Sequence, residues 1–302
     1  MADVSSLILG TAQIGHPYGI ANRHREPDRA RAVRVIQEAV GRGIFSIDTA
    51  QAYGVSEKMV GAALKEIGCR DKMRVISKFH PDLNHLDSKT MLDSLDGSLA
   101  RLGVDVMGGM LFHREASIDL LDRGLSDVIR SLLFTGRVEK IGVSVYSPDF
   151  ALRALMSDGI SIVQVPTNIL DRRFIDEGVF DLAESLGKEV HVRSVFLQGL
   201  ILMKPEELPE YMSFARHIVE EIRLLSQRLS VSPKQMALDF LKVSVPQARI
   251  VFGAEIPEQV QENWEFWKSE PREDVLGHLE AICKTCDERI INPSQWKQQG
   301  ET

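Results

Sequence analysis

The chain has 302 residues, 44% of them hydrophobic, and a formal net charge of −7. The negative charge and the lack of a basic block argue against nucleic acid or an anionic membrane as a partner. No apolar run approaches the ~18 residues of a membrane span, and the first residues lack signal-peptide character, so we expect a cytoplasmic protein.

Short apolar runs alternate with helix-like patterns along almost the whole chain. The predicted strands are residues 7–10, 45–48, 75–78, 110–113, 140–143, 162–165, 190–194 and 249–251. Repeated strand–helix units require a parallel sheet with right-handed crossovers. Eight such units in this length favour an α/β fold of the closed (β/α)8 TIM-barrel type over an open sheet. We expect residues 1–302 to form one domain, with a polar tail over about 292–302 in which Trp296 could dock.

Local signals mark the ends of several helices. Asp87 can cap a helix that Gly103 terminates, and the Ser56 hydroxyl is expected to cap another. Pro233 and Pro257 fit the first turns of two further helices, where a missing amide hydrogen costs nothing. The polar segment 204–211, which contains two prolines, is long enough to act as a flap over the barrel mouth.

Polar residues end most of the predicted strands. They are Asp48, Lys78, His113, Ser144, Gln164 and Ser194, the last beside Arg193. In a parallel barrel the carboxyl ends of all strands meet at one face, which holds the active site. A packed interior would place Val or Ile there, and loop capping explains only two or three of the six. We therefore predict an active site at this face.

Tyr53, five residues after Asp48, adds a phenol to this group. Its ordinary pKa of ~10 is high for proton donation, and a Lys78 ammonium within about 4–6 Å would lower it. Asp48 would keep Lys78 charged, and His113 could hydrogen-bond a carbonyl oxygen. Together these groups can polarise a carbonyl and protonate its oxygen. None of them can deliver a hydride, so a cofactor is required.

Other catalytic sites fit the sequence less well. No G-x-S-x-G, phosphate-loop or G-x-G-x-x-G motif occurs, and only one strand ends in a carboxylate. His80 and His85 have poor spacing for a metal, and Cys283 with Cys286 form a lone C-x-x-C inside a helical pattern. We expect no metal. Three cysteines in total are also too few for a disulfide framework.

Asp, Tyr, Lys and His at successive strand ends resemble the catalytic tetrad of the aldo-keto reductase superfamily. The resemblance covers about residues 7–266, and its most specific part runs from Asp48-Thr49-Ala50 through Tyr53-Gly54 to Ser56-Glu57. It implies that Tyr53 is the general acid/base, assisted by Lys78, Asp48 and His113.

The resemblance also implies a nicotinamide cofactor. Thr11 and Ala12 lie in a loop like the one that approaches the nicotinamide, and Ser144 and Gln164 match residues that contact its carboxamide. The strand-seven loop resembles a pyrophosphate-binding loop, and the last loop and helix resemble an adenosine site. The implied cofactor residues also include Asp48, Arg193, Ser194, Phe196, Gln198, Gly199, Gly253, Glu255, Gln259, Glu262 and Asn263. NADP(H) is the family default, but Glu255 and the lack of a base nearby make NAD(H) a contender.

The sequence departs from the family pattern chiefly at Arg193, where an aromatic residue usually stacks under the nicotinamide. We predict an NAD(P)-dependent enzyme that interconverts an alcohol and an aldehyde, ketone or sugar. A sugar (aldose) dehydrogenase, a cofactor-binding regulatory subunit and a non-catalytic barrel are alternatives. The loops 16–25, 79–86 and 114–122 contain few aromatic residues, which favours a polar small-molecule substrate, although solvated loops explain this equally well. The sequence does not indicate an oligomeric state.

Overall fold

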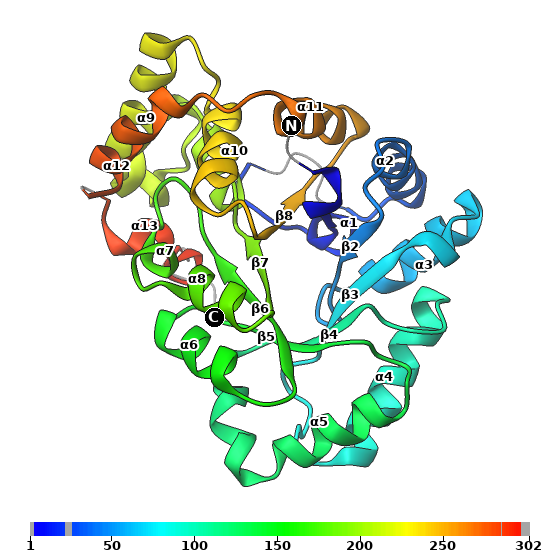
Figure 1. Cartoon of the computed structure of the whole chain (residues 1–302). Coiled ribbons are helices and arrows are strands. Elements are labelled where there is room, and N and C mark those ends of the chain that lie inside the picture. The colour runs from blue at the N-terminus through cyan, green and yellow to red at the C-terminus, as the bar shows by residue number, and fades with distance from the viewer. Residues whose placement is uncertain (1–2, 22–25, 285, 297–302) are drawn as a thin grey trace.

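Eight parallel strands form a closed barrel in the computed structural model, which describes residues 3–21, 26–284 and 286–296 (Figure 1). The strands are β1 (Leu7–Gly10), β2 (Ser46–Asp48), β3 (Arg74–Phe79), β4 (Gly109–Phe112), β5 (Ile141–Ser144), β6 (Ile160–Pro166), β7 (Glu189–Arg193) and β8 (Arg249–Gly253). Each strand pairs with the next in the chain, and β8 closes the barrel against β1. The predicted (β/α)8 fold is confirmed, with strand bounds within a few residues of those expected.

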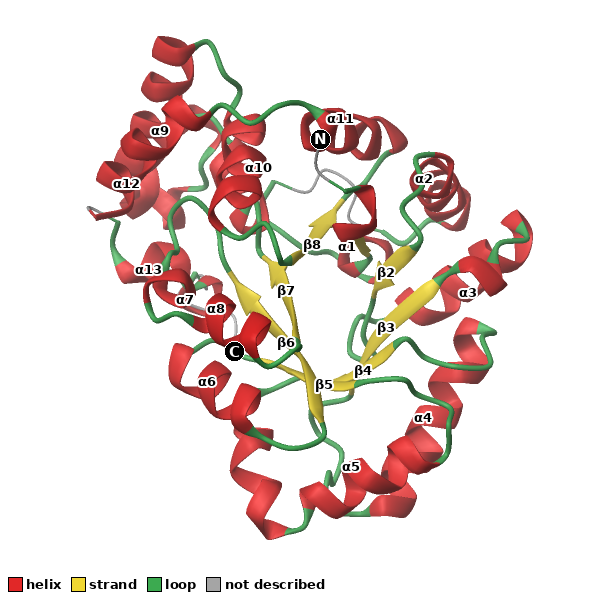
Figure 2. Cartoon of the chain, in the orientation of Figure 1, coloured by secondary structure: helices red, strands yellow, loops and turns green. Residues whose placement is uncertain are grey.

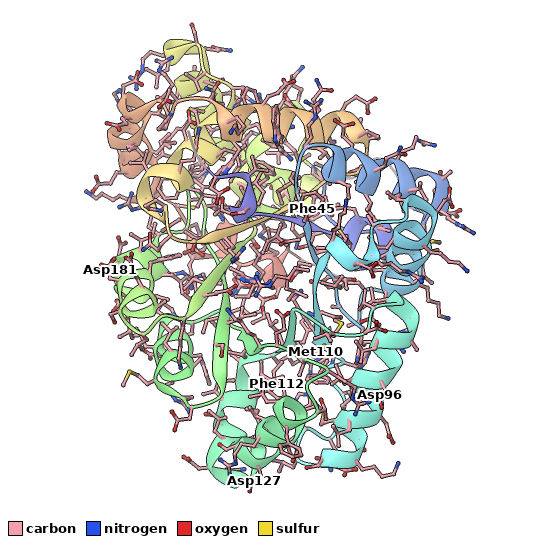
Figure 3. The ribbon with its side chains drawn as sticks, turned by 45° about the vertical axis from the view of Figure 1, so that its right-hand side comes forward. Phe45, Asp96, Met110, Phe112, Asp127 and Asp181 are labelled. Atoms are coloured by element: carbon pink, nitrogen blue, oxygen red, sulfur yellow. The ribbon has the colours of Figure 1, made fainter. Side chains whose placement is uncertain are left out.

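Helices surround the barrel on its outside (Figure 2). They are α1 (Ala12–Gly15), α2 (Arg29–Gly41), α3 (Ser56–Ile67), α4 (Ser88–Leu102), α5 (Leu125–Phe134), α6 (Pro148–Met156), α7 (Arg173–Asp176), α8 (Val179–Ser185), α9 (Arg216–Leu229), α10 (Pro233–Ser244), α11 (Pro257–Lys268), α12 (Leu276–Lys284) and α13 (Glu288–Ile291). The main core lies between strands and helices: Met110 and Phe112 of β4 are buried there, whereas Asp96, Asp127 and Asp181 are exposed at the periphery (Figure 3). No helix in the described ranges is long and apolar enough to span a bilayer.

The predicted helix ends are confirmed at α4 and α10. Asp87 accepts a hydrogen bond from the Lys89 amide at 3.1 Å, and Gly103 takes the left-handed φ of 69° after the last turn of α4. Pro233 lies in the first turn of α10, behind the Ser232 cap.

The prediction that Ser56 caps α3 is wrong. Ser56 is the first residue of the helix, and the preceding Val55 occupies the capping position. The buried Ser56 hydroxyl donates to the Thr11 carbonyl at 3.0 Å and accepts from the Thr49 hydroxyl at 2.9 Å. It therefore ties α3 to the ends of β1 and β2 instead of satisfying a helix amide.

The segment 204–211 does not cover the barrel mouth. It forms the short helix η5 (Pro205–Glu207) and the start of η6 (Glu210–Ala215), and Arg216 at the beginning of α9 donates to the Pro205 carbonyl at 2.8 Å. The flap prediction is wrong in this structure, because none of residues 204–211 lines the cavity at the carboxyl ends of the strands, and η5 and η6 lie against α9 instead. In the tail, Trp296 is 5% exposed and donates to the Arg289 carbonyl at 2.8 Å, while residues 297–302 lie outside the described ranges.

Candidate active site

A cavity of about 180 Å³ opens at the carboxyl ends of the strands. Fourteen of the predicted site residues line it: Thr11, Ala12, Asp48, Tyr53, Gln164, Arg193, Ser194, Phe196, Gln198, Gly199, Gly253, Glu255, Gln259 and Asn263. Four others, Lys78, His113, Ser144 and Glu262, lie behind or beside this lining. The barrel topology therefore brings together residues that are spread over most of the sequence.

A buried ion pair joins Lys78 and Asp48 below the cavity. The Lys78 Nζ lies 2.5 Å from the Asp48 Oδ1 and 3.0 Å from the Thr49 carbonyl oxygen, and the two charged side chains are 1% and 5% exposed. The Gln164 amide donates to the other Asp48 oxygen at 2.8 Å. Desolvation lowers the pKa of Lys78, and the Asp48 charge opposes this shift. Both oxygens of the carboxylate are therefore engaged.

Tyr53 lies against this pair and against His113. The Lys78 Nζ is 5.1 Å from the centroid of the Tyr53 ring, and the His113 ring meets that ring edge-on at 5.7 Å. Desolvation raises the pKa of Tyr53, the Asp48 charge raises it further, and Arg193 lowers it. The expectation that Lys78 depresses this pKa is wrong here, because desolvation of the phenol and the Asp48 charge raise the pKa overall.

His113 is the neutral member of the group. Desolvation lowers the pKa of His113 to about 3, and the charges of Lys78 and Arg193 contribute further. At neutral pH its imidazole is therefore uncharged and can donate one hydrogen bond. Its Nδ1 is buried and has no partner among the described residues.

Arg193, at the end of β7, faces the cavity from the opposite side of the barrel. Its guanidinium donates to the Ser144 hydroxyl at 3.3 Å, the Val145 carbonyl at 3.3 Å and the Ser194 hydroxyl at 3.2 Å. It also stacks on Tyr146, with Cζ 4.2 Å from the ring centroid. The sequence did not predict this stack, although Tyr146 follows the strand-five serine by only two residues.

The cavity continues along the loop after β7 towards α11. Ser194, Leu197 and Gln198 adopt left-handed φ values of 59°, 46° and 54°, which non-glycine residues rarely take. Three of the four such residues in the described ranges lie in this loop. Backbone strain of this kind concentrates at ligand-binding sites.

The far end of the cavity is formed by α10 and α11. The Glu255 amide donates to the Gln259 side chain at 2.7 Å, and the buried Asn263 Oδ1 has no partner among the described residues. Lys234 of α10 lines the cavity and forms an ion pair with Glu262. Sequence reasoning missed Lys234, because only the fold brings the start of α10 to the loop after β8.

Two supporting contacts hold the loop that carries Tyr53. The buried Glu57 carboxylate accepts from the Ser77 hydroxyl and from Arg101, each at 2.6 Å, and so fixes α3 beside β3. Gly15 of α1 lies so close to this loop that an added Cβ would be 1.9 Å from the Tyr53 carbonyl oxygen. Only glycine permits this approach.

The described residues contain no group of three or more His, Cys, Asp or Glu side chains arranged for a metal ion. The His85 Nδ1 lies 3.2 Å from the Ser117 hydroxyl, and Cys69, Cys283 and Cys286 are free thiols. The Asn168 side-chain amide donates to the Ser194 carbonyl at 3.1 Å and accepts from the Leu170 amide at 2.9 Å.

Comparisons with known proteins match most of the chain. The model of the Aldo/keto reductase family matches residues 6–284. An NADH-specific methylglyoxal reductase from Escherichia coli strain K12 is 26% identical, over 86% of this chain and 89% of that protein. A holo-form aldo-keto reductase from Bacillus halodurans has the same fold, with a TM-score of 0.75 and 23% identity over 95% of each chain. An aldo/keto reductase from Klebsiella pneumoniae in complex with NADP and acetate gives a TM-score of 0.69 and 20% identity, over 92% of this chain and 90% of that chain.

Proposed function

Because the chain belongs to the aldo/keto reductase family of oxidoreductases, we propose that it interconverts a carbonyl compound and an alcohol with a nicotinamide cofactor, using Tyr53 as the general acid/base. The observation that carries this proposal is the position of Tyr53 between the Lys78–Asp48 ion pair and the neutral His113. No observation favours a regulatory or non-catalytic role over this reaction.

Two side chains act on the carbonyl oxygen in different ways. His113 donates a hydrogen bond that orients this oxygen, since a neutral imidazole retains one N–H. Tyr53 gives the oxygen a proton as negative charge develops there, and takes one from the alcohol in the reverse direction. The raised pKa of Tyr53 keeps the proton on the phenol at neutral pH until that moment. The bound cofactor supplies or accepts the hydride at the carbonyl carbon.

Several features of the cavity suit a dinucleotide. The strained loop from Ser194 to Gln198 presents backbone along the cavity wall, where a pyrophosphate would lie. The unpartnered, buried Asn263 oxygen at the far end can accept a hydrogen bond from an adenine amino group. Thr11, Ala12 and Gln164 would hold the nicotinamide end beside Tyr53.

We take NADP(H), the usual cofactor of the family, as the first choice, and NAD(H) as the alternative. Glu255 suits a ribose hydroxyl better than a 2′-phosphate, since two negative groups repel. Lys234 is the nearest candidate for a phosphate partner, but Glu262 already pairs with it. The similar proteins fit either choice, because one is a reductase specific for NADH and another binds NADP.

The substrate is a small polar molecule. His16 lies 5.6 Å from the Tyr53 ring, and His80 and Arg114 contribute to the charge around His113. Polar side chains at the rim match a hydroxylated or charged carbonyl compound better than a polycyclic one.

The test is a screen of aldehydes, ketones and sugars with each reduced cofactor, followed at the nicotinamide absorbance band. Tyr53→Phe should lower turnover by roughly 10²–10⁴-fold while cofactor binding persists, as expected for loss of a general acid. Tyr211→Phe, on η6 and outside the cavity lining, is the matched control and should keep full activity. Near-wild-type turnover in Tyr53→Phe would show that the assigned mechanism is wrong.

A further inference from the structure

Arg193 carries a charge that no carboxylate matches in the part of the chain that the structure describes. Among the described residues, its hydrogen bonds go to two hydroxyl groups and one carbonyl oxygen, all of them neutral. The two lysines near the cavity differ from Arg193, since Lys78 pairs with Asp48 and Lys234 pairs with Glu262. Arg193 therefore places an unpaired positive charge beside the reaction centre, whereas the Glu255 carboxylate lies at the far end of the cavity.

The guanidinium is also held in a fixed plane. One face stacks on the Tyr146 ring, at 4.2 Å from its centroid. The Glu115 carboxylate accepts from the Tyr146 and Ser147 amides, at 2.7 and 3.0 Å, and so fixes the segment that carries this ring. The guanidinium can therefore not swing freely into solvent to relieve repulsion with a ligand.

The chemistry of hydride transfer places the nicotinamide ring close to this charge. A carbonyl carbon held by Tyr53 and His113 must lie about 3–3.5 Å from the hydride donor. The ring therefore lies beside Tyr53 in the cavity that Gln164 and Arg193 also line. Arg193 is near enough to Tyr53 and His113 to affect their pKa values, which supports this proximity.

We propose that Arg193 makes the site discriminate between the oxidation states of the cofactor, so that it binds NAD(P)H more tightly than NAD(P)⁺. This inference rests on the proposed function, because it takes the cavity to be the cofactor site. The oxidised nicotinamide ring carries a positive charge that the reduced ring lacks, and the guanidinium repels only the charged form. An aromatic side chain at the same position would do the opposite, since its π face attracts a cation.

The preference has a direct effect on the bound redox couple. Each ten-fold excess of the dissociation constant of the oxidised cofactor over that of the reduced one raises the two-electron potential of the bound couple by about 30 mV. In the direction of carbonyl reduction, the site would take up the reduced cofactor readily and release the oxidised product readily. The Arg193 charge thus speeds release of the oxidised cofactor. It also makes the bound reduced cofactor a weaker reductant, so hydride transfer to the carbonyl within the site is less favourable.

The test is a titration of the full chain with NADPH, NADP⁺, NADH and NAD⁺, monitored by calorimetry or by protein fluorescence. Arg193→Met removes the charge, and Arg193→Lys keeps it. We expect the ratio of the dissociation constants, oxidised over reduced, to fall by about ten-fold or more in Arg193→Met and to remain high in Arg193→Lys. The fall should be equal for the phosphorylated and unphosphorylated pairs, because the 2′-phosphate lies at the other end of the cavity.

Two further variants make the outcome decisive. Arg114→Met removes a cation near His113 that lies outside the cavity lining, and the ratio should not change. Arg193→Gln retains hydrogen-bonding capacity without charge and replaces Arg193→Met if the latter unfolds; here too the ratio must fall. An unchanged ratio in a folded, uncharged variant that binds both cofactor forms would overturn the inference and leave the proposed function intact. Failure of the wild type to bind any of the four cofactors would instead overturn the proposed function.

Discussion

The two ends of the barrel each contain a carboxylate held by basic side chains, but they use it differently. At the amino ends of the strands, Glu189 accepts hydrogen bonds from Arg74 at 3.0 and 3.1 Å, from Lys140 at 2.5 Å and from His191 at 2.9 Å, and it forms an ion pair with Arg249 at 3.1 Å. At the carboxyl ends, Asp48 binds one lysine and one glutamine. One end concentrates four basic groups on a single acid, and the other distributes polar groups around a cavity.

This difference separates a closing cluster from a reactive one. Arg74, Lys140 and His191 all direct donors at the Glu189 carboxylate, so the cluster ties the amino ends of the strands together at the bottom of the barrel. Near Asp48, the Tyr53 phenol and the His113 imidazole can donate hydrogen bonds to a molecule in the cavity, and Arg193 offers it a positive charge. Polar composition alone does not distinguish the two ends; what differs is that the basic groups at the amino ends converge on one carboxylate, whereas the polar groups at the carboxyl ends line a cavity.

The largest expected effect follows from breaking the pair at the reactive end. Lys78→Met leaves the Asp48 carboxylate buried without its cation, which should lower the free energy of unfolding by about 3–5 kcal/mol. Activity should also be lost, because the variant changes the charge beside Tyr53. Denaturant unfolding and turnover measure the two effects. Wild-type stability in this variant would show that water or a proton compensates the charge.

A somewhat smaller effect is expected at the closing end. Glu189→Gln leaves Arg74, Lys140 and Arg249 close together without their acid, which should cost about 3 kcal/mol of unfolding free energy. Turnover per folded molecule should be unchanged, because the cluster lies at the opposite end of the strands. Unfolding curves and specific activity measured on the same preparation check both statements. A loss of turnover without a loss of stability would contradict the division between the two ends.

The sequence predicted the fold, and which residues surround the cavity, because these signals are local. Polar residues such as Asp48 and Gln164 interrupt apolar strands. Each of these positions can be recognised from the sequence of its own strand, without knowing which other strands lie beside it. The direction of the Tyr53 pKa could not be predicted, since it depends on desolvation and on the pairing of Lys78 with Asp48. The Arg193–Tyr146 stack and the position of Lys234 depend on contacts between elements far apart in the chain.

A third prediction concerns cofactor choice, where the expected difference is modest. Preference for NADPH over NADH should stay below about 100-fold, or ~2.7 kcal/mol, because Glu255 opposes a phosphate and Glu262 holds Lys234. Lys234→Met should weaken NADPH binding more than NADH binding. Titration of both reduced cofactors measures this difference. A much stronger preference for NADPH would reveal a phosphate clamp that these residues do not provide.

The smallest expected effect is that of pH. Tyr53 has a pKa above its usual value of ~10, and the pKa of His113 is lowered to about 3, so neither group changes protonation between about pH 6 and pH 9. Carbonyl reduction, which needs the protonated phenol, should be nearly constant there and decline only at higher pH. Alcohol oxidation, which needs the phenolate, should increase with pH. Rate profiles in both directions test this, and a parallel trend in the two would exclude a shared acid/base.

The contact between Gly15 and the Tyr53 carbonyl has a consequence for how this protein can evolve or be recombined. The first loop and the loop after β2 fit together only because position 15 lacks a side chain, and the Val55 amide donates to the Gly15 carbonyl at 3.3 Å. The two loops must therefore be exchanged together, although more than thirty residues separate them in the printed sequence. A chimera that takes its first loop from a parent with alanine at position 15 would displace Tyr53, the proposed acid/base, even if every proposed catalytic residue were retained.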